Sequence, residues 1–297
     1  MDGIIIINKP RGCTSHDIVY KAKKITGEKV GHTGTLDPNA TGVLPLLIGK
    51  GTLLSKYLIN HDKIYEVTLK LGEKRDTADS EGEVIETNTV QKEVLTEETV
   101  IKVLKSFIGK QEQIPPMYSA IKVNGKKLYE YARKGESIEL TPRKIEIYDI
   151  QLLNINKEEL EICFEVSCSK GTYIRSLCED IASKLKNVGY MKELKRTKVG
   201  DFDIKQAITI DEFEKYTKQL KQDGSKESMK DYFISLEKAF ENKQAIKLNN
   251  FELKKFLNGV KLQTNMNDDI YKIYNEDNCF IGIGIVKSNF LKRDIIL

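Results

Sequence analysis

The pattern of apolar and polar positions predicts a protein built from both strands and helices. Residues 3–8 form a short apolar run typical of a buried strand. Residues 64–71 alternate apolar and polar side chains with a period of two, which predicts a strand with Tyr65 on its apolar face. Residues 15–26 and 96–108 carry apolar side chains at the spacing of amphipathic helices. Sheet and helix segments therefore alternate along the first third of the chain.

The later part of the chain shows weaker patterns. Residues 145–155 and 160–168 predict two paired strands, and a helix is expected to begin near Thr172. Residues 218–230 are hydrophilic and are expected to form a loop. Short strands are expected at 245–248, 269–274 and 279–286. The chain should therefore end in a small β-rich part.

Helix boundaries and one tight turn can be placed from single residues. Ser15 is expected to cap the first helix, and Gly27 is expected to end it. Asn124-Gly125 is a strong signal for a turn between two short strands. The residues that follow this turn, Lys126–Lys134, are expected to form a short basic helix.

A polar and turn-rich stretch, residues 31–46, lies between apolar segments, and Asp37 is its one carboxylate. Pro38 disfavours the helical conformation for Asp37, so its side chain should be held out from an extended backbone. Asp followed by Pro is also a common helix start, with Asp as the N-cap. Gly42 and Pro45 leave room for only about two helical turns. A catalytic and a capping interpretation of Asp37 are therefore both open.

Composition excludes several classes of protein. The 297 residues are 40% hydrophobic and 31% charged, which is typical of a soluble globular protein. No apolar run is long enough to span a membrane, and the first residues lack a secretory signal, so a cytoplasmic location is expected. The five cysteines form no C-x-x-C pair, and there are only three histidines. Neither a disulfide framework nor a metal site is therefore expected.

The net charge of +4 says little about partners, but its distribution says more. Residues 118–135 carry five Lys or Arg against one Glu, and residues 184–198 carry six against one. Tyrosines lie within both stretches, and such clusters suit RNA phosphates and exposed bases. A solvated lysine-rich surface would explain each cluster as well.

Residues 31–44 read Gly-His-Thr-Gly-Thr-Leu-Asp-Pro-Asn-Ala-Thr-Gly-Val-Leu. This stretch closely resembles the catalytic motif of the bacterial tRNA pseudouridine-55 synthases, the TruB family. Residues 113–133 resemble the insertion with which that family grips a tRNA stem-loop, and residues 169–175, Ser-Lys-Gly-Thr-Tyr-Ile-Arg, match another of its segments. The resemblance is strong over residues 1–200 and weak beyond them.

The resemblance implies an α+β fold with a mixed, mainly antiparallel pseudouridine-synthase sheet flanked by helices. The catalytic domain would span residues 1–238, with a basic RNA-gripping insertion at about 113–144. Residues 239–297 would form a small, β-rich, PUA-like RNA-binding domain.

The resemblance also implies catalytic roles. Asp37 would be the essential carboxylate, and Tyr65 would contact the target base and assist the late proton transfer. A Tyr on the apolar face of a strand is otherwise ordinary core packing. Arg175 would pair with Asp37. Since Arg175 is expected in the first turn of a helix, where the dipole favours anions, an anion should compensate it unless its side chain is simply exposed.

Further residues would bind the substrate. His32 would occupy the space that a flipped uridine vacates, although a histidine in a loop can simply be a hydrogen-bonding residue. Tyr173 and Leu194 match family positions that line the pocket. Lys126, Lys127 and Arg133 would contact the RNA.

The function implied is isomerisation of the T-loop uridine at position 55 of tRNA by a monomer that needs no cofactor. The tRNA T stem-loop would be its partner, and Asp37 would act either as a nucleophile or as a general base. Three other interpretations stay open. The chain could resemble the guide-RNA-dependent relatives of this family, act as a tRNA-folding chaperone without catalysis, or be a plain RNA-binding module, which would not need Asp37.

Overall fold

The computed structural model describes residues 1–59, 61–136, 138–223 and 232–297. Its main element is a ten-stranded sheet. The path through this sheet runs in the order β14 (Phe233–Ser235), β1 (Gly3–Lys9), β3 (Thr41–Ile48), β12 (Gly189–Val199), β4 (Lys63–Leu71), β11 (Glu161–Cys168), β10 (Arg143–Asn156) and β7 (Gly109–Gln113). Off this path, β2 (Val30–His32) pairs with β3, and β13 (Phe202–Asp203) pairs with β12. Among these described strands only the pairing of β12 with β3 is parallel, so the expected mainly antiparallel sheet is confirmed.

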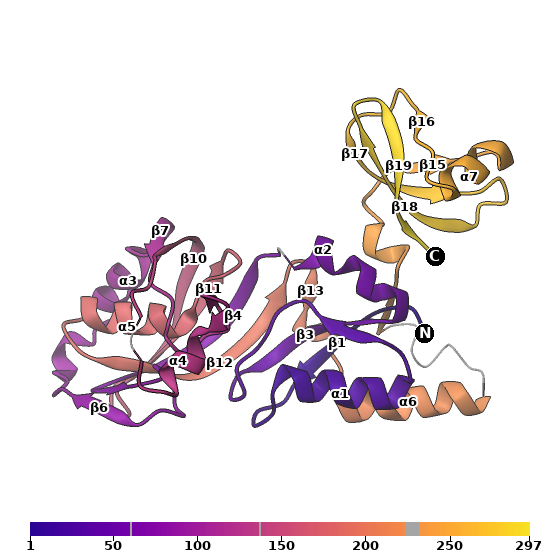
Figure 1. Cartoon of the computed structure of the whole chain (residues 1–297). Coiled ribbons are helices and arrows are strands. Elements are labelled where there is room, and N and C mark those ends of the chain that lie inside the picture. Colours follow the sequence, from indigo (N-terminus) through magenta and orange to yellow (C-terminus); the bar gives the residue numbers. More distant parts are fainter. Residues whose placement is uncertain (60, 137, 224–231) are drawn as a thin grey trace.

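Four helices cover one face of this sheet. They are α1 (Ser15–Thr26), α3 (Glu97–Lys105), α5 (Ile174–Lys184) and α6 (Ile210–Asp223). Figure 1 shows α1 and α6 along the half of the sheet that contains β1 and β3, and α3 and α5 near β10 and β11. A single large core joins these helices to the sheet through apolar side chains such as Ile18, Leu177 and Phe213. Burial of this apolar surface is the main source of the fold's stability.

The cap of α1 differs from the expected one. Thr14, not Ser15, is the N-cap: its side chain accepts a hydrogen bond from the Asp17 backbone N–H, and Asp17 caps Thr14 in return. Ser15 is buried, and its hydroxyl binds the backbone of Leu36 instead. Gly27 ends the helix in the left-handed conformation, as expected.

The opposite face of the sheet carries a second core. The 3-10 helix η1 (Gly49–Leu54) and the short α2 (Ser55–Leu58) lie there, with Leu54 and Leu58 packed against Ile4 and Ile6 of β1. Outside the basic insertion, the other small elements in the described part of residues 1–240 are β5 (Glu73–Arg75), β6 (Val84–Thr87), η2 (Lys92–Val94), η3 (Ile204–Gln206) and η5 (Lys238–Phe240). β5 and β6 form a separate two-stranded hairpin.

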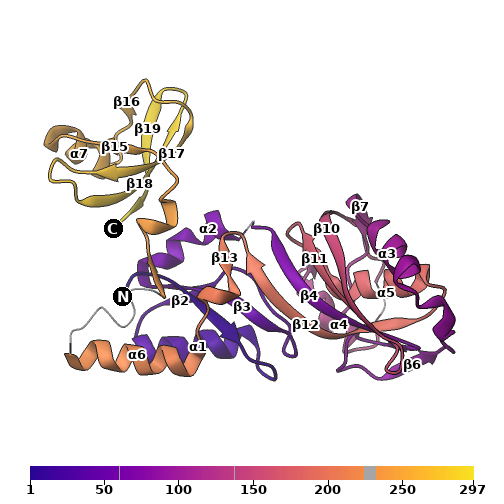
Figure 2. The ribbon, with the colours of Figure 1, turned by 180° about the vertical axis from the view of Figure 1, so that it is seen from behind.

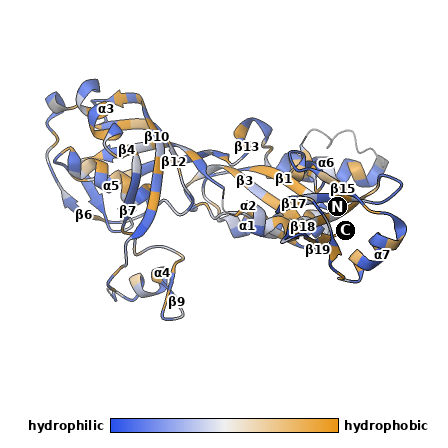
Figure 3. Cartoon of the chain, turned by 90° about the horizontal axis from the view of Figure 1, so that it is seen from above, coloured by the Kyte–Doolittle hydropathy of each residue, from blue (hydrophilic) through white to orange (hydrophobic). Residues whose placement is uncertain are grey.

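The basic insertion forms a small arm. β8 (Lys122–Val123) and β9 (Lys126–Lys127) pair across a turn in which Asn124 and Gly125 both have positive φ, as the Asn-Gly signal predicts. The helix expected at 126–134 is shorter, because α4 spans only Leu128–Ala132 and the two lysines before it belong to β9. Figure 3 shows this arm projecting from the body of the molecule.

The expected loop at 218–230 is partly wrong. α6 continues to Asp223, because its apolar positions pack on α1 and on the sheet. Residues 224–230 lie outside the described residues. The strand β12 was also not expected, since lysines interrupt the apolar pattern of residues 189–199.

The C-terminal residues form a second sheet of five strands. Its order is β15 (Ala245–Lys247), β17 (Asp269–Tyr274), β18 (Phe280–Lys287), β19 (Phe290–Ile296) and β16 (Leu262–Gln263). α7 (Asn250–Leu257) packs on it around a separate small core. The three expected short strands are confirmed as β15, β17 and β18, whereas β19 and α7 were not expected. Figures 1 and 2 place this sheet beside α2 and the N-terminus, away from α3 and β7.

The two sheets are joined by direct contacts. Ile283 and Ile295 of the small sheet belong to the same buried core as Ile4 and Ile6 of β1. Lys56 and Tyr57 of α2 also contact the carboxylate of Asp294 in β19. The C-terminal sheet therefore packs on the face of the large sheet that lies opposite the four helices.

Candidate active site

The Asp37 loop connects β2 to β3, and both strands hold its ends, because Val30–His32 pair with Leu46–Ile48. No helix follows Asp37: the chain makes a single turn in which the Ala40 N–H donates to the Asp37 carbonyl at 3.1 Å. The capping interpretation of Asp37 is therefore wrong. The carboxylate is left available for other partners.

Three buried side chains fix the backbone of this loop. The Ser15 hydroxyl accepts from the Leu36 N–H at 2.8 Å and donates to its carbonyl at 3.1 Å. The Lys9 ammonium donates to the Pro38 carbonyl at 3.0 Å, next to Asp37. Arg196 of β12 donates to the Gly34 carbonyl at 3.0 Å, on the other side of Asp37. The loop is irregular, but side chains from three different elements specify its conformation.

Arg175 lies beside Asp37, although 138 residues separate them in the sequence. Its Nε is 3.1 Å from Oδ2 of Asp37, and its Nη2 is 3.5 Å from Oδ1. The guanidinium side chain is only 7% exposed, whereas that of Asp37 is 36% exposed. A buried cation in the first turn of α5 is thus compensated by a carboxylate that still reaches solvent.

The same guanidinium contacts two more segments. Nη2 donates to the Tyr118 carbonyl at 3.0 Å, at the root of the arm, and Nη1 donates to the Thr77 carbonyl at 3.3 Å. Nη1 also lies 3.8 Å from the carboxylate of Asp79, in the turn between β5 and β6. Arg175 therefore connects the Asp37 loop, this turn and the arm.

The protonation of Asp37 depends on opposing effects. Burial raises the pKa of Asp37 above its ordinary value, and the charge of Asp79 adds to this. Arg175 is the strongest of the groups that lower this pKa, followed by Lys9 and Arg196. The cations around the loop thus counteract the cost of desolvating the carboxylate.

Tyr65 of β4 is 7% exposed and packs in the main core, so the structure gives it the core contacts of an ordinary inward tyrosine. Burial raises the pKa of Tyr65 to about 12, although Arg196 opposes this through its charge and a side-chain hydrogen bond. The phenol is therefore neutral at physiological pH, and its proposed action on a base is that of a neutral group.

The other residues predicted to line the pocket lie on β2, on β12 and just before α5. His32 accepts a hydrogen bond at Nδ1 from the Gly34 N–H at 3.2 Å, so it does act as a hydrogen-bonding residue of the loop. Burial lowers the pKa of His32, which favours the neutral imidazole. Leu194 is buried on β12, opposite Val67 of β4. Tyr173 precedes α5, where the Gln113 side chain binds both its N–H, at 2.8 Å, and its carbonyl, at 3.0 Å.

The remaining predicted residues lie on the arm and not beside Asp37. We call Lys126, Lys127 and Arg133 the arm cations. Lys127 and Arg133 both approach the ring of Tyr129, each 5.3 Å from its centroid, and Lys126 lies 5.9 Å from that of Tyr131. The arm thus combines cations with aromatic rings, as the sequence indicated.

The second basic stretch, residues 184–198, does not form a comparable surface. Lys195 pairs at 3.2 Å with Glu66 of the neighbouring strand β4, and Lys192 pairs with Glu161 of β11, one strand further along the sheet. Arg196 is buried, and Lys184 donates to the Ser106 hydroxyl at 2.8 Å. These cations belong largely to the sheet, which favours the non-binding interpretation of this stretch.

Sequence reasoning missed two of the residues that fix the loop. Lys9 resembled a turn residue after a strand, and Arg196 was counted in a surface cluster, yet both are fully buried. Their one sequence signal is spacing: a buried apolar residue, Ile7 or Leu194, lies two positions before each cation and so on the same face of its strand.

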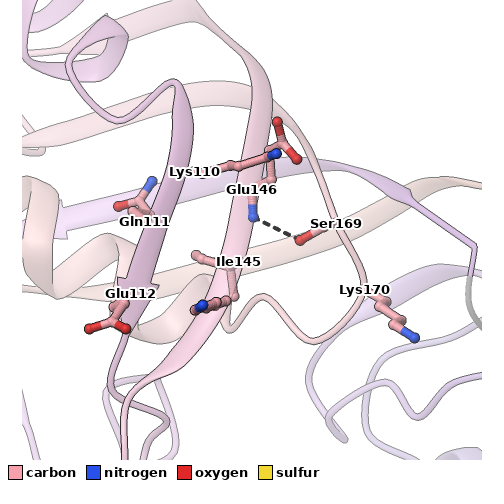
Figure 4. Close-up of a pocket in the computed structure, with 8 residues that line it drawn as sticks. Lys110, Gln111, Glu112, Ile145, Glu146, Ser169 and Lys170 are labelled. Atoms are coloured by element: carbon pink, nitrogen blue, oxygen red, sulfur yellow. Dashed lines mark hydrogen bonds between the residues drawn. The ribbon is translucent and has the colours of Figure 1, made fainter.

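One hollow of the described surface lies away from Asp37. It has a volume of about 640 Å³ and is lined by β7, β10 and the turn at Ser169 and Lys170 (Figure 4). Lys110 is opposite Glu146, and Glu112 is opposite Lys144, so charges of both signs alternate along it. None of the predicted site residues lines it.

None of the helices in the described part of the chain is long and apolar enough to cross a membrane.

Two family models match the chain. TruB family pseudouridylate synthase (N terminal domain) matches residues 22–174, and the tRNA pseudouridylate synthase B C-terminal domain matches residues 175–241. The tRNA pseudouridine synthase B of Clostridium kluyveri is 44% identical over 97% of this chain and 96% of its own length. That of Aquifex aeolicus is 40% identical over the whole of both chains.

Solved structures show the same fold. A crystal structure of a Cbf5-Nop10-Gar1 complex contains a chain that is 27% identical, with a TM-score of 0.71 over 99% of this chain and 83% of that one. An H/ACA RNP bound to a substrate RNA containing 2'-deoxyuridine contains another, 24% identical, with a TM-score of 0.72 over 99% of this chain and 85% of that one. The two family models and the full-length relatives assign the chain to the TruB family of tRNA pseudouridine synthases, which are isomerases.

Proposed function

We propose that this chain isomerises the T-loop uridine at position 55 of tRNA, and that Asp37 is the essential catalytic carboxylate. The observation that supports this most is the pair of Asp37 and Arg175, with Nε and Oδ2 3.1 Å apart. The carboxylate stays partly open to solvent on a loop that buried side chains fix. A rigid, accessible and charge-paired carboxylate is what a reacting group in a preorganised site requires.

The reaction moves the glycosidic bond from N1 to C5 of the same uracil. A folded T-loop hides the uridine, so it is flipped into the site at a cost of a few kcal/mol. His32 braces the space that the base leaves, and Tyr173 and Leu194 line the pocket. Asp37 then attacks carbon or takes the ribose C2′ proton, two roles that the geometry supports equally.

Two groups assist Asp37. Arg175 aims the carboxylate and favours its ionised form, because an adjacent cation stabilises the charge. Tyr65 stacks on the uracil and takes part in removal of the C5 proton as a neutral phenol, consistent with its pKa of about 12.

The remaining parts of the chain would hold the RNA. The arm cations contact phosphates of the T stem, and the aromatic rings beside them contact exposed bases. We also propose the boundary between a catalytic domain, residues 1–238, and a PUA-like RNA-binding domain, residues 239–297. It is supported by the change of sheet between β14, which ends at Ser235, and β15, which begins at Ala245.

The test is tritium release from T stem-loop RNA labelled at C5 of uridine. We expect the wild type to act on the bare stem-loop without a guide RNA, and Asp37→Asn to abolish turnover while it still binds. The matched control is Asp211→Asn, which should retain full turnover. Asp211 is an exposed carboxylate of α6 that pairs with Lys21 of α1. A stem-loop with cytidine at position 55 should release no tritium.

Four results would count against the proposal. Substantial turnover by Asp37→Asn would remove Asp37 from the chemistry. Release from the position-55 cytidine loop would place the target elsewhere. Dependence on an added guide RNA would favour the ribonucleoprotein type of enzyme, and cellular complementation by Asp37→Asn would favour a chaperone role.

A further inference from the structure

Arg196 occupies a special place in the sheet. It lies on β12, the strand between β3, which follows the Asp37 loop, and β4, which carries Tyr65. In the register of these strands Arg196 is paired with Gly42 of β3 on one side and with Tyr65 of β4 on the other. One residue thus joins the two segments that are proposed to touch the uracil.

The Arg196 side chain reaches both ends of the Asp37 loop. Nη2 donates to the Gly34 carbonyl at 3.0 Å and Nη1 to the Thr35 carbonyl at 3.5 Å, just before Asp37. Nε donates to the carbonyl of Val43, near the start of β3, at 2.8 Å. The guanidinium also acts on the Tyr65 side chain, whose pKa it lowers against the effect of burial. These contacts use the planar fork that lysine lacks.

Gly42 makes this approach sterically feasible. Its φ is +102°, and a Cβ at this position would lie 2.2 Å from the carbonyl oxygen of Arg196. β3 and β12 can therefore come this close only where β3 has no side chain.

The charge of Arg196 is unusual as well. The residue is 1% exposed, and within the described ranges no carboxylate lies in ion-pair distance of it, the closest contacts being the carbonyls. A buried cation is normally paired with an anion. The two acidic groups that its charge reaches are Tyr65 and Asp37.

We propose that Arg196 is a positioning residue for isomerisation, which holds the Asp37 loop and Tyr65 in one register and supplies positive charge to both groups. This rests on the proposed function of Asp37 and Tyr65. Arg196 has no contact with substrate in this role and acts through the residues that it holds.

The proposal has a pH signature. The charged groups that face Asp37 are Arg175 of α5, Asp79 of the β5–β6 turn, Lys9 of β1 and Arg196 of β12. The titratable groups that face Tyr65 are Arg196, Asp37 and the Cys168 thiol, which stays neutral because burial raises its pKa to about 11. Without the charge of Arg196, the pKa of Asp37 rises further, so more of the carboxylate is protonated at a given pH. The acid limb of the rate profile then moves to higher pH.

Two substitutions separate geometry from charge. Arg196→Lys keeps the charge but loses the fork, and Arg196→Met loses both. Each is measured by single-turnover tritium release at saturating tRNA from pH 4 to 9, with tRNA affinity and melting temperature in parallel. Both variants should be slower by about 10²-fold, since a misplacement of about 1 Å costs that much, and both should bind tRNA like the wild type. Only Arg196→Met should shift the acid limb.

Val199→Ala is the matched control, because Val199 lies on the same strand and is buried in the core of the opposite face. It lowers the melting temperature but should leave the acid limb unchanged. A normal rate in either Arg196 variant, or an acid limb of Arg196→Met that coincides with that of the wild type, would overturn the proposal. Should Arg196→Met fail to fold, the rate of Arg196→Lys still decides the positioning role. Turnover by Asp37→Asn would instead overturn the proposed function, whereas an inactive Asp37→Asn with normal Arg196 variants would defeat this inference alone.

Discussion

Replacement of Arg175 by lysine should slow isomerisation strongly although it conserves the charge. The guanidinium contacts both oxygens of Asp37, at 3.1 and 3.5 Å, and donates to the carbonyls of Tyr118 and Thr77. An ammonium is a point charge on a flexible stem, so it can restore one contact with Asp37 but not the whole arrangement.

The magnitude follows from the hydrogen bond to Asp37 that lysine cannot make. A hydrogen bond to a charged group contributes about 1.5–3 kcal/mol. Each 1.4 kcal/mol of transition-state stabilisation corresponds to about tenfold in rate. Because Asp37 would keep one of its two bonds to the side chain, the single-turnover rate of Arg175→Lys should fall about 10- to 100-fold.

The assay is single-turnover tritium release at saturating tRNA, with tRNA affinity measured separately. Arg11→Lys is the control, because Arg11 forms an exposed ion pair with Glu193 at 3.7 Å, and such pairs contribute little. It should retain the wild-type rate. A rate for Arg175→Lys within twofold of the wild type would refute the reasoning, since two-pronged contact with Asp37 would then be dispensable.

Three further predictions concern binding and stability. Alanine at the three arm cations should weaken tRNA binding. The slope of log Kobs against log salt concentration should fall in magnitude by about 0.7–0.9 for each phosphate that the arm no longer neutralises, as titrations at several salt concentrations would measure. An unchanged slope would exclude the arm from phosphate binding. Gly42→Ala should destabilise the chain by more than about 1 kcal/mol, because φ is +102° and the Cβ would meet the Arg196 carbonyl, and an unchanged thermal unfolding curve would contradict this. Since burial raises the pKa of Asp37 in the folded state, its contribution to stability is present below pH 3.8 and is lost as pH rises through the folded pKa. Asp37→Asn has no such loss, so its melting temperature should be higher than that of the wild type at pH 7, and the difference should disappear in acid. Thermal unfolding measured over a pH series checks this. A lower melting temperature of Asp37→Asn at pH 7 would show that the charge stabilises the fold.

The sequence predicted those parts of the fold that local physics determines. The period-two alternation of β4, the glycine that ends α1 and the Asn-Gly turn of the arm all depend on a few neighbouring residues. β12 was missed because Lys195 and Lys192 pair with carboxylates of β4 and β11, which only the sheet brings close to them. Thr14 replaced Ser15 as the cap because the Ser15 hydroxyl is used by Leu36, a contact across 21 residues.

The candidate site was predictable to a similar extent. Asp37 could be singled out by its loop, and Arg175 by its place in the first turn of a helix, but their approach to 3.1 Å depends on tertiary structure. Lys9 and Arg196 were not identified, because a cation in a sequence is usually an exposed one. Both cations are buried because the Asp37 loop brings its backbone carbonyls to them, and no short sequence pattern predicts the conformation of that loop.

The shared core beneath β1 limits how freely the last part of this enzyme can be exchanged. Ile283 and Ile295 pack in the same core as Ile4 and Ile6, so residues from both ends of the sequence bury one another. A chain cut after Phe240 would present the N-terminal isoleucines to water and become prone to aggregation. Swapping in the tail of a relative would therefore require matched apolar residues at the very start of the sequence.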